Sequence, residues 1–405
     1  MTSIPVALSK ELAVAKAWVL EQALPFWSST GFDQSAQLFE ERVDFSGRLV
    51  PDVPRRLMVQ CRQIYVFSHA TLLGWFDGHA LVEQAWLSLL RIYGGRSFDA
   101  PYVFSVTRTG EIADSRQDTY AYAFLLFASA WARKVLGDKV LQKFTDDLID
   151  HLKARLAHTS GQGFIDGLPR PDRYLRQNPH MHLFEAFLQL EEAFSSIKKR
   201  SLSYSVYRLF RDRFFQAQLR ALPELYDDNW RPVDTPDAVF EPGHHFEWIW
   251  LLDRYAARSG EQVDDLVTAL EDRAYCEGVD QDGAAIETVA MRGGRRVESR
   301  RCWGTCEALK AAASGFENER ARELAMERAA RFLRALRTLF LSGPFPGGWI
   351  DRVDAQGKPL VDYVPASTLY HIFLAVAEAD RVFGPKGVGR PCLTSAPNGQ
   401  NGVVS

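Results

Sequence analysis

The sequence predicts an all-α protein, an (α/α)6 toroid barrel in which six inner helices are surrounded by six outer ones. Three observations lead to this fold class. Apolar residues recur with a 3.6-residue period in about twelve segments, which end at Gly, Pro or Asp/Asn clusters. The connections between segments alternate between long and short. Every second segment is apolar around most of its circumference, as expected for a buried helix.

The expected helices follow one another along almost the whole chain. In order they cover residues 7–27, 54–76, 79–93, 117–135, 138–157, 179–195, 198–220, 243–258, 261–277, 299–314, 319–340 and 365–382. No break in composition divides them, so residues 1–383 are expected to form a single barrel domain. Residues 384–405 are rich in Gly and Pro and are predicted to be a flexible C-terminal tail.

Long connections precede every inner helix and should therefore gather at one end of the barrel. Examples are residues 28–53, 96–116 and 342–364. Residues 102–115 and 347–363 alternate apolar and polar side chains around a Gly-containing turn, which predicts short β-hairpins in these loops. The functional site is expected at this end.

A structural period of about 60 residues supports the barrel, because one helical hairpin with its loop recurs at this interval. Six polar or aromatic residues mark the starts of successive inner helices: Arg62, Tyr120, His182, His244, Trp303 and His371.

Composition excludes several classes of function. The 405 residues are 46% hydrophobic and 24% charged, with a net charge of -3, so the chain is globular and has no long-range attraction for nucleic acid. The longest apolar stretch, 120–132, is too short to span a membrane, and the N-terminus shows no export signal. Five cysteines without framework spacing predict a reducing, cytoplasmic compartment.

Five histidines fall in the first turns of three inner helices: His180, His182, His244, His245 and His371. Imidazole exchanges protons near neutral pH, so a ring of histidines at one end of the barrel suits proton transfer. The alternative is a set of capping or core histidines. A metal site is a third interpretation, since HMH and HH resemble ligand pairs. Cys302 and Cys306 lack a second cysteine pair, and no metal is expected.

Carboxylates lie on the same inner helices: Asp118, Glu185, Glu247 and Glu307. Glu247 follows His244 by three residues and shares its helix face. The carboxylates on these helices leave two alternatives: a paired-carboxylate glycosidase, and structural ion pairing with Arg62. The basic run 292–301 is expected to be a solvated loop, with phosphate binding as the alternative.

Seven segments of the inner helices and their loops carry motifs: LMVQCRQIYVFSHA, DTYAYAFLLFASA, NPHMHLFEAFLQL, EPGHHFEWIWLL, RRCWGTCEALKAA, GGWIDRVDAQGKP and STLYHIFLA. Together they resemble the N-acylglucosamine 2-epimerase superfamily, which also contains mannose and sulfosugar aldose–ketose isomerases and cellobiose 2-epimerase. The resemblance extends from Pro54 to Phe373. It implies an (α/α)6 barrel, in agreement with the helix pattern.

The resemblance also implies roles for individual residues. His244 of PGHHFEW and His371 of LYHIF match the catalytic histidine pair, and His182 of HMHLFEAF matches a third active-site histidine. Positions that hold the sugar match Arg62, Tyr120, Asn178, Glu247, Trp303 and Glu307. Ser367 departs from the isomerase members, which can carry Gln there, and this leaves the substrate open.

Proton transfer at C2 of an open-chain aldose follows from this assignment. His371 is expected to remove the C2 proton while Arg62 or His182 stabilises O1 and O2. Return of the proton to C1 gives a ketose, whereas reprotonation of the opposite face by His244 gives the 2-epimer; His244 can also open the ring. Neither path uses a metal or a nicotinamide, so no cofactor is expected.

Two outcomes remain open: isomerisation of an unphosphorylated aldose such as mannose to fructose, which is preferred, and interconversion of N-acetylglucosamine with N-acetylmannosamine. Alternatives of other classes are an (α/α)6 glycoside hydrolase using Glu247 and Glu307 and a noncatalytic sugar-binding protein. The expected partner is a small monosaccharide, with neither nucleic acid nor membrane, and a homodimer is the assembly considered.

Overall fold

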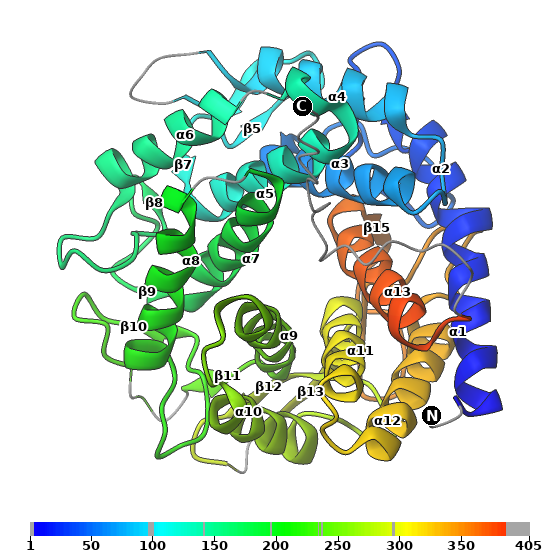
Figure 1. The fold of residues 1–405 in the computed structure, drawn as a ribbon. Helices are drawn as coiled ribbons and strands as arrows, with labels where there is room; N and C mark the ends of the chain where they lie inside the picture. The colour runs from blue at the N-terminus through cyan, green and yellow to red at the C-terminus, as the bar shows by residue number, and fades with distance from the viewer. Residues whose placement is uncertain are drawn as a thin grey trace, which may run out of the picture.

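Helices alternate between an inner and an outer layer around a common centre (Figure 1). The computed structural model describes residues 4–95, 101–140, 142–194, 197–233, 235, 238–293 and 296–385. Its α-helices are α1 (Val6–Trp18), α2 (Leu24–Ser29), α3 (Leu57–Leu72), α4 (His79–Tyr93), α5 (Thr119–Leu136), α6 (Gln142–His151), α7 (Gln177–Ala193), α8 (Ile197–Leu209), α9 (Pro242–Ser259), α10 (Asp264–Glu277), α11 (Cys302–Glu317), α12 (Arg322–Ala335) and α13 (Leu369–Phe383). The predicted (α/α)6 barrel is confirmed.

The inner ring consists of α3, α5, α7, α9, α11 and α13, each packed against the next, with α13 returning to α3 (Figure 1). Their sequences explain this position, because α5 buries almost every residue while α12 buries only one stripe at three- and four-residue spacing. Several outer helices continue into a π-helical turn at Val19–Ala23, Leu152–Leu156, Phe210–Phe214 and Leu336–Phe340.

Short antiparallel strands join the six long loops into a closed circle. They are β1 (Phe32–Asp33), β2 (Leu38–Phe39), β3 (Arg42–Asp44), β4 (Arg55–Arg56), β5 (Ser105–Val106), β6 (Ile112–Asp114), β7 (Gln117–Asp118), β8 (Gly167–Leu168), β9 (Leu175–Arg176), β10 (Leu225–Tyr226), β11 (Val239–Phe240), β12 (Ile286–Ala290), β13 (Arg296–Arg301), β14 (Arg352–Val353) and β15 (Tyr363–Pro365). Each loop pairs with the next one around the barrel, through β4–β5, β7–β8, β9–β10, β11–β12, β13–β14 and finally β15–β3. These pairings hold the starts of the inner helices in place.

The strands also account for the helix ends that the sequence pattern places wrongly. The helix expected at 299–314 begins instead at Cys302, because the preceding residues pair as β13 with β12 and β14. The helix expected at 198–220 gives way after Leu209 to a π-helical turn. The predicted hairpin within 102–115 is confirmed by the pairing of β5 with β6.

Within the basic run 292–301, residues 296–301 form the strand β13 instead of a loop, although most of them are exposed as expected. Arg300 is buried there and pairs with Asp280 at 2.7 Å and Asp282 at 2.8 Å. From residue 386 onward the expected C-terminal tail lies outside the described residues. No described helix has the length and apolar character needed to cross a membrane.

Candidate active site

The starts of three inner helices bring three histidines together at the loop end of the barrel. His182 lies in the first turns of α7, His244 in those of α9 and His371 in those of α13. All three are almost completely buried. Glu247 connects them, because its carboxylate lies 3.7 Å from Nδ1 of His182 and within 4.8 Å of a ring nitrogen of His371. The three histidines expected to be catalytic therefore form one cluster.

The other two histidines of the expected ring do not belong to this cluster. His180 donates from Nδ1 to the Arg176 carbonyl at 3.0 Å and accepts at Nε2 from the Phe164 amide at 2.9 Å. His245 accepts from the Leu222 amide at 3.0 Å. Successive helical residues point about 100° apart, so a residue one or two positions from an inward-facing histidine faces the wall. The expectation that five histidines converge is wrong for these two, which anchor loops.

His371 is held as a neutral base. Its Nδ1 donates to Oε1 of Glu307 at 2.7 Å, and Glu307 is paired with Lys310 at 2.5 Å. Burial, followed by the charges of Arg62 and Lys310, lowers the pKa of His371 well below its usual value. The neutral ring keeps its proton on Nδ1, so the lone pair of Nε2 can accept a proton from substrate.

His244 has the opposite protonation state. Its Nδ1 donates to Oε2 of Glu224 at 2.9 Å, and Glu241 lies 4.0 Å away. Burial opposes the charge, but these two carboxylates outweigh it and raise the pKa of His244 to about 10. The Gln177 amide donates to Glu224 at 3.1 Å and accepts from the Trp248 indole at 2.8 Å, which fixes the carboxylate. At neutral pH His244 is a buried cation and a potential general acid.

Removal of the Glu224 charge should therefore change the pH dependence of the enzyme. In Glu224→Gln the burial that lowers the pKa of His244 remains while its main counter-charge is lost. Because the protonated form of His244 is the active one, the alkaline limb of kcat/KM should move down from near pH 10 by about one pH unit or more. Glu224→Asp keeps the negative charge, so its alkaline limb should lie close to that of the wild type. A pH–rate profile with an unmoved limb would contradict this role.

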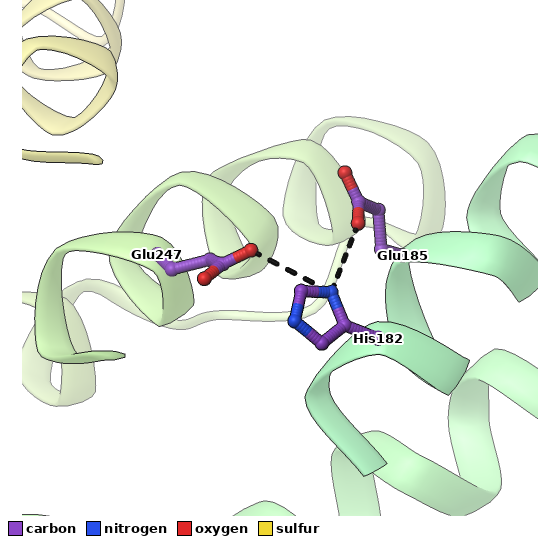
Figure 2. A group of neighbouring side chains, drawn as sticks. All are labelled: His182, Glu185 and Glu247. Atoms are coloured by element: carbon purple, nitrogen blue, oxygen red, sulfur yellow. Dashed lines mark hydrogen bonds and ion pairs between the residues drawn. The ribbon is translucent and has the colours of Figure 1, made fainter. Parts of the chain in front are cut away.

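His182 lies between two carboxylates, as Figure 2 shows. Its Nδ1 is 3.3 Å from Oε2 of Glu185 and 3.7 Å from Oε1 of Glu247. Glu185 also accepts from the Tyr370 hydroxyl at 2.6 Å. Burial lowers the pKa of His182 to about 4, so the ring is neutral at physiological pH. It donates from Nδ1 and can accept a sugar hydroxyl at Nε2, whereas it carries no charge to stabilise an oxyanion.

Arg62 is the cation that can stabilise an oxyanion. It donates to the Ser367 carbonyl at 3.0 Å and to the Tyr120 hydroxyl at 2.5 Å, and its guanidinium lies 4.3 Å from the centre of the Phe124 ring. It is 5% exposed and forms no ion pair with a described carboxylate. A buried cation without a counter-ion is costly unless an anion arrives. This arrangement is suited to negative charge that develops on a bound substrate.

The Trp303 indole forms a wall beside both His244 and His371. Its ring centre lies 5.1 Å from that of His244 and 5.7 Å from that of His371. The indole can occupy this position because residue 243 is a glycine. A Cβ at Gly243 would lie 2.5 Å from the indole and 3.1 Å from Cα of Gly304. The close approach of α9 and α11 therefore depends on a residue without a side chain.

Gly243→Ala should displace Trp303 and lower kcat/KM by at least about tenfold, since a misplacement of about 1 Å in an active site can cost 10²-fold. The matched control is Gly304→Ala on the facing helix, where a Cβ would make ordinary van der Waals contacts, with Ala285 at 3.4 Å and Cα of Gly243 at 3.8 Å. Steady-state kinetics of both variants checks the prediction. Equal activity in both would show that the position of Trp303 is unimportant.

Two further residues expected to bind sugar have unsatisfied polar atoms in the described structure. Asn178, in the first turn of α7, has a buried Oδ1 without a hydrogen-bond partner, and the same holds for Oε1 of Glu247. Burial, followed by the charge of Glu307, raises the pKa of Glu247 well above its usual value. Both side chains can bond a ligand, and their role as sugar-binding residues stays a prediction.

Groups with the composition of metal ligands occur in the cluster. They are His182 with Glu185 and Glu247, Glu224 with Glu241 and His244, and Glu247 with Glu307 and His371. In the third group Lys310 already lies 2.5 Å from Glu307, and in the second His244 is itself a cation. A divalent ion would be repelled by the positive charges beside the second and third groups, so these two donor sets fit protons better than a metal.

The carboxylate geometry also bears on the glycosidase alternative. Oxygens of Glu247 and Glu307 lie within 4.8 Å of each other. Inverting glycosidases separate their two carboxyl groups by about 6.5–9.5 Å and retaining ones by about 5–5.5 Å, so this spacing disfavours the inverting arrangement alone. Glu307 is in addition engaged by His371 and Lys310. The pair is therefore better suited to holding imidazole and lysine than to cleaving a glycoside.

Comparison with known proteins decides the family. The sequence profile of N-acylglucosamine 2-epimerase (GlcNAc 2-epimerase) matches residues 38–375. The chain belongs to the N-acylglucosamine 2-epimerase family. It is 34% identical to the mannose-6-phosphate isomerase of Rhizobium meliloti (strain 1021), covering 90% of this chain and 95% of that protein. It is 27% identical to the D-mannose isomerase of Thermobifida fusca, covering 67% and 71%.

A further family relative is the cellobiose 2-epimerase of Bacteroides fragilis, 22% identical over 65% of this chain and 71% of that protein. The relatives are named epimerases and isomerases, and the protein is accordingly a sugar isomerase or epimerase.

Solved structures share the family fold. The cellobiose 2-epimerase of Bacillus thermoamylovorans B4167 superposes with a TM-score of 0.82 at 19% identity, covering 92% of this chain and 99% of that one. A D-mannose isomerase superposes with a TM-score of 0.81 at 20% identity, covering 94% and 100%. The GH76 α-mannanase BT2949 from Bacteroides thetaiotaomicron shares the barrel at 8% identity and a TM-score of 0.69, covering 93% and 100%. The similarity to this hydrolase concerns the fold alone.

The site contains residues that the sequence patterns do not reveal. Lys310 could have been found, because a lysine on an otherwise apolar inner helix, three residues after Glu307, needs a buried partner. Glu224 carries no such signal, since it lies in a loop and reaches His244 only through the fold.

Proposed function

We propose that the protein is an aldose–ketose isomerase that interconverts a mannose-type sugar with its ketose by proton transfer at C2. The observation that carries this proposal is the pair of imidazoles beside Trp303, with His371 neutral and His244 cationic. One group is prepared to take a proton and the other to give one. The names of two relatives, which are mannose-type isomerases, support the choice of sugar.

The reaction then balances without a metal or a nicotinamide. His371 takes the C2 proton of the open-chain aldose, and the C–H electron pair moves into an enediolate whose O1 charge is stabilised by Arg62. His244 protonates O1. In the second half, the now neutral His244 accepts the O2 proton while His371 returns its proton to C1, which leaves the ketose.

Epimerisation at C2 is the second candidate, favoured by the relationship to a cellobiose 2-epimerase. It differs after the first step: O1 of the enediolate stays unprotonated, His244 delivers its proton to the opposite face of C2, and the C1 carbonyl re-forms. His371 then loses its proton to solvent and His244 regains one, which resets both imidazoles. N-acetylglucosamine and N-acetylmannosamine are the pair considered for this outcome.

Product analysis separates the candidates. The enzyme is incubated with mannose, mannose 6-phosphate, N-acetylglucosamine and cellobiose, and products are identified by NMR. Fructose from mannose supports the proposal. N-acetylmannosamine, or the 2-epimer of cellobiose, as the only product would replace it with epimerisation, and turnover of none of these sugars would contradict both.

Activity should survive exhaustive dialysis against EDTA, because the two imidazoles supply both acid and base. We expect less than about a twofold change in kcat, measured before and after dialysis with metal content determined in parallel. Activity that is lost on dialysis and returns only with a divalent cation would contradict the metal-free scheme and would point to the histidine–carboxylate groups as ligands.

We place this activity in the cytoplasm. The four cysteines in the described part of the chain, Cys61, Cys276, Cys302 and Cys306, are free thiols, which is typical of a reducing compartment.

A further inference from the structure

A cavity of about 450 Å³ lies beside the catalytic cluster. Its walls come from β3 and β15, from β4 and β5, and from the end of β13. Two of its residues connect it to the cluster. Ser367 accepts a hydrogen bond from Arg62 and precedes His371 by one turn, and the guanidinium of Arg301 lies 6.0 Å from the centre of the Trp303 ring.

Three arginines and two carboxylates line this cavity. Arg56 is neutralised by Glu41 at 2.5 Å, and Asp351 accepts from the Thr368 hydroxyl at 2.6 Å. Arg42 and Arg301 differ from Arg56, because neither pairs with a described carboxylate.

Two further features of Arg42 suit it to bind a ligand. Its guanidinium stacks 4.5 Å above the Tyr363 ring, and the β3–β15 pairing holds both residues. Its Nε is buried and has no hydrogen-bond partner in the described structure. The two guanidinium groups contribute like charges to one cavity and neither forms an ion pair there, although Glu41 and Asp351 also line it. An anion bound by both guanidinium groups reduces their repulsion. Guanidinium groups bind phosphate oxygens through paired, directional hydrogen bonds.

We propose that Arg42 and Arg301 form a subsite for a phosphate group carried by the sugar, at the end remote from C2. The inference rests on the proposed function and revises the expectation that the aldose is unphosphorylated. The subsite would bind the anionic substituent while C1 and C2 lie between His371 and His244.

The test compares kcat/KM for mannose 6-phosphate with kcat/KM for mannose. The wild type should prefer the phosphorylated sugar. Arg42→Gln and Arg301→Gln should each lower the ratio of the two values on the order of tenfold, as expected when a hydrogen-bonded charge contact is lost. The matched control is Arg48→Gln, which removes an exposed arginine that pairs with Asp44 outside the cavity. A wild type without preference, or ratios unchanged in both variants, would overturn the subsite.

Calorimetry with inorganic phosphate tests the subsite independently of turnover. Phosphate should bind the wild type, bind both variants more weakly, and compete with mannose 6-phosphate. If neither sugar is converted, the proposed function fails, yet loss of phosphate binding in Arg42→Gln would still support the subsite. Phosphate binding that leaves mannose 6-phosphate kinetics unchanged would mean a site for a free anion and would overturn the inference, as would no binding.

Discussion

His371→Gln should lower kcat by at least the roughly 10²-fold typical of a lost general base, and exchange of the C2 proton with solvent should fall with it. The reason is that Nε2 of His371 is the unprotonated nitrogen of a ring whose Nδ1 is committed to Glu307 at 2.7 Å. Glutamine retains a hydrogen-bonding group of similar reach but cannot accept the proton. Turnover and deuterium exchange, measured on the same sample, check the prediction.

A matched control is His79→Gln, since His79 is exposed at the start of α4, away from the cluster. Both variants must show the circular dichroism and melting temperature of the wild type, because the fully buried Glu307 loses its hydrogen bond from His371 in His371→Gln. Wild-type exchange and turnover in folded His371→Gln would remove His371 from the mechanism and return Glu247 and Glu307 to consideration.

His244→Gln is the second variant with a large expected effect, again of at least about 10²-fold in kcat. The proton that His244 holds through Glu224 and Glu241 is the one that O1 requires in the proposed isomerisation. In an isomerase, C2 exchange and ketose formation should therefore fall together. The alkaline limb near pH 10 should also disappear, because its titrating group is gone.

In an epimerase the same substitution gives a different result. His371 could still remove the C2 proton, so exchange would persist while the 2-epimer no longer forms. Folded His244→Gln with unchanged turnover would exclude the proposed acid. Because Glu224 loses its cation in this variant, the thermal stability of Glu224→Gln/His244→Gln should be measured beside it.

The barrel could be predicted because its signals are repeated along the chain. Apolar periodicity in α5, set against the one-sided pattern of α12, distinguishes inner from outer helices. The end of a helix depends on fewer contacts. The apolar pattern predicts a helix from residue 299, yet the backbone of residues 296–301 pairs with β12 and β14. Local pattern cannot reveal such pairings.

The candidate site was predictable where a residue belongs to a motif on an inner helix, as for His182, His244 and His371. Motifs do not tell which of two adjacent histidines faces inward, and His245 proves to bond a loop amide instead. The charge states of the histidines could not be predicted from the sequence. That of His244 depends on Glu224, which lies in a loop twenty residues earlier.

Proton NMR of mannose in D2O with EDTA-treated enzyme tests the central claim, metal-free proton transfer at C2, most directly. We expect deuterium at C2 of the recovered mannose and at C1 of the fructose formed, with exchange lost in His371→Gln and retained in His79→Gln. Turnover without deuterium in either sugar, or exchange that requires added metal, would contradict the claim.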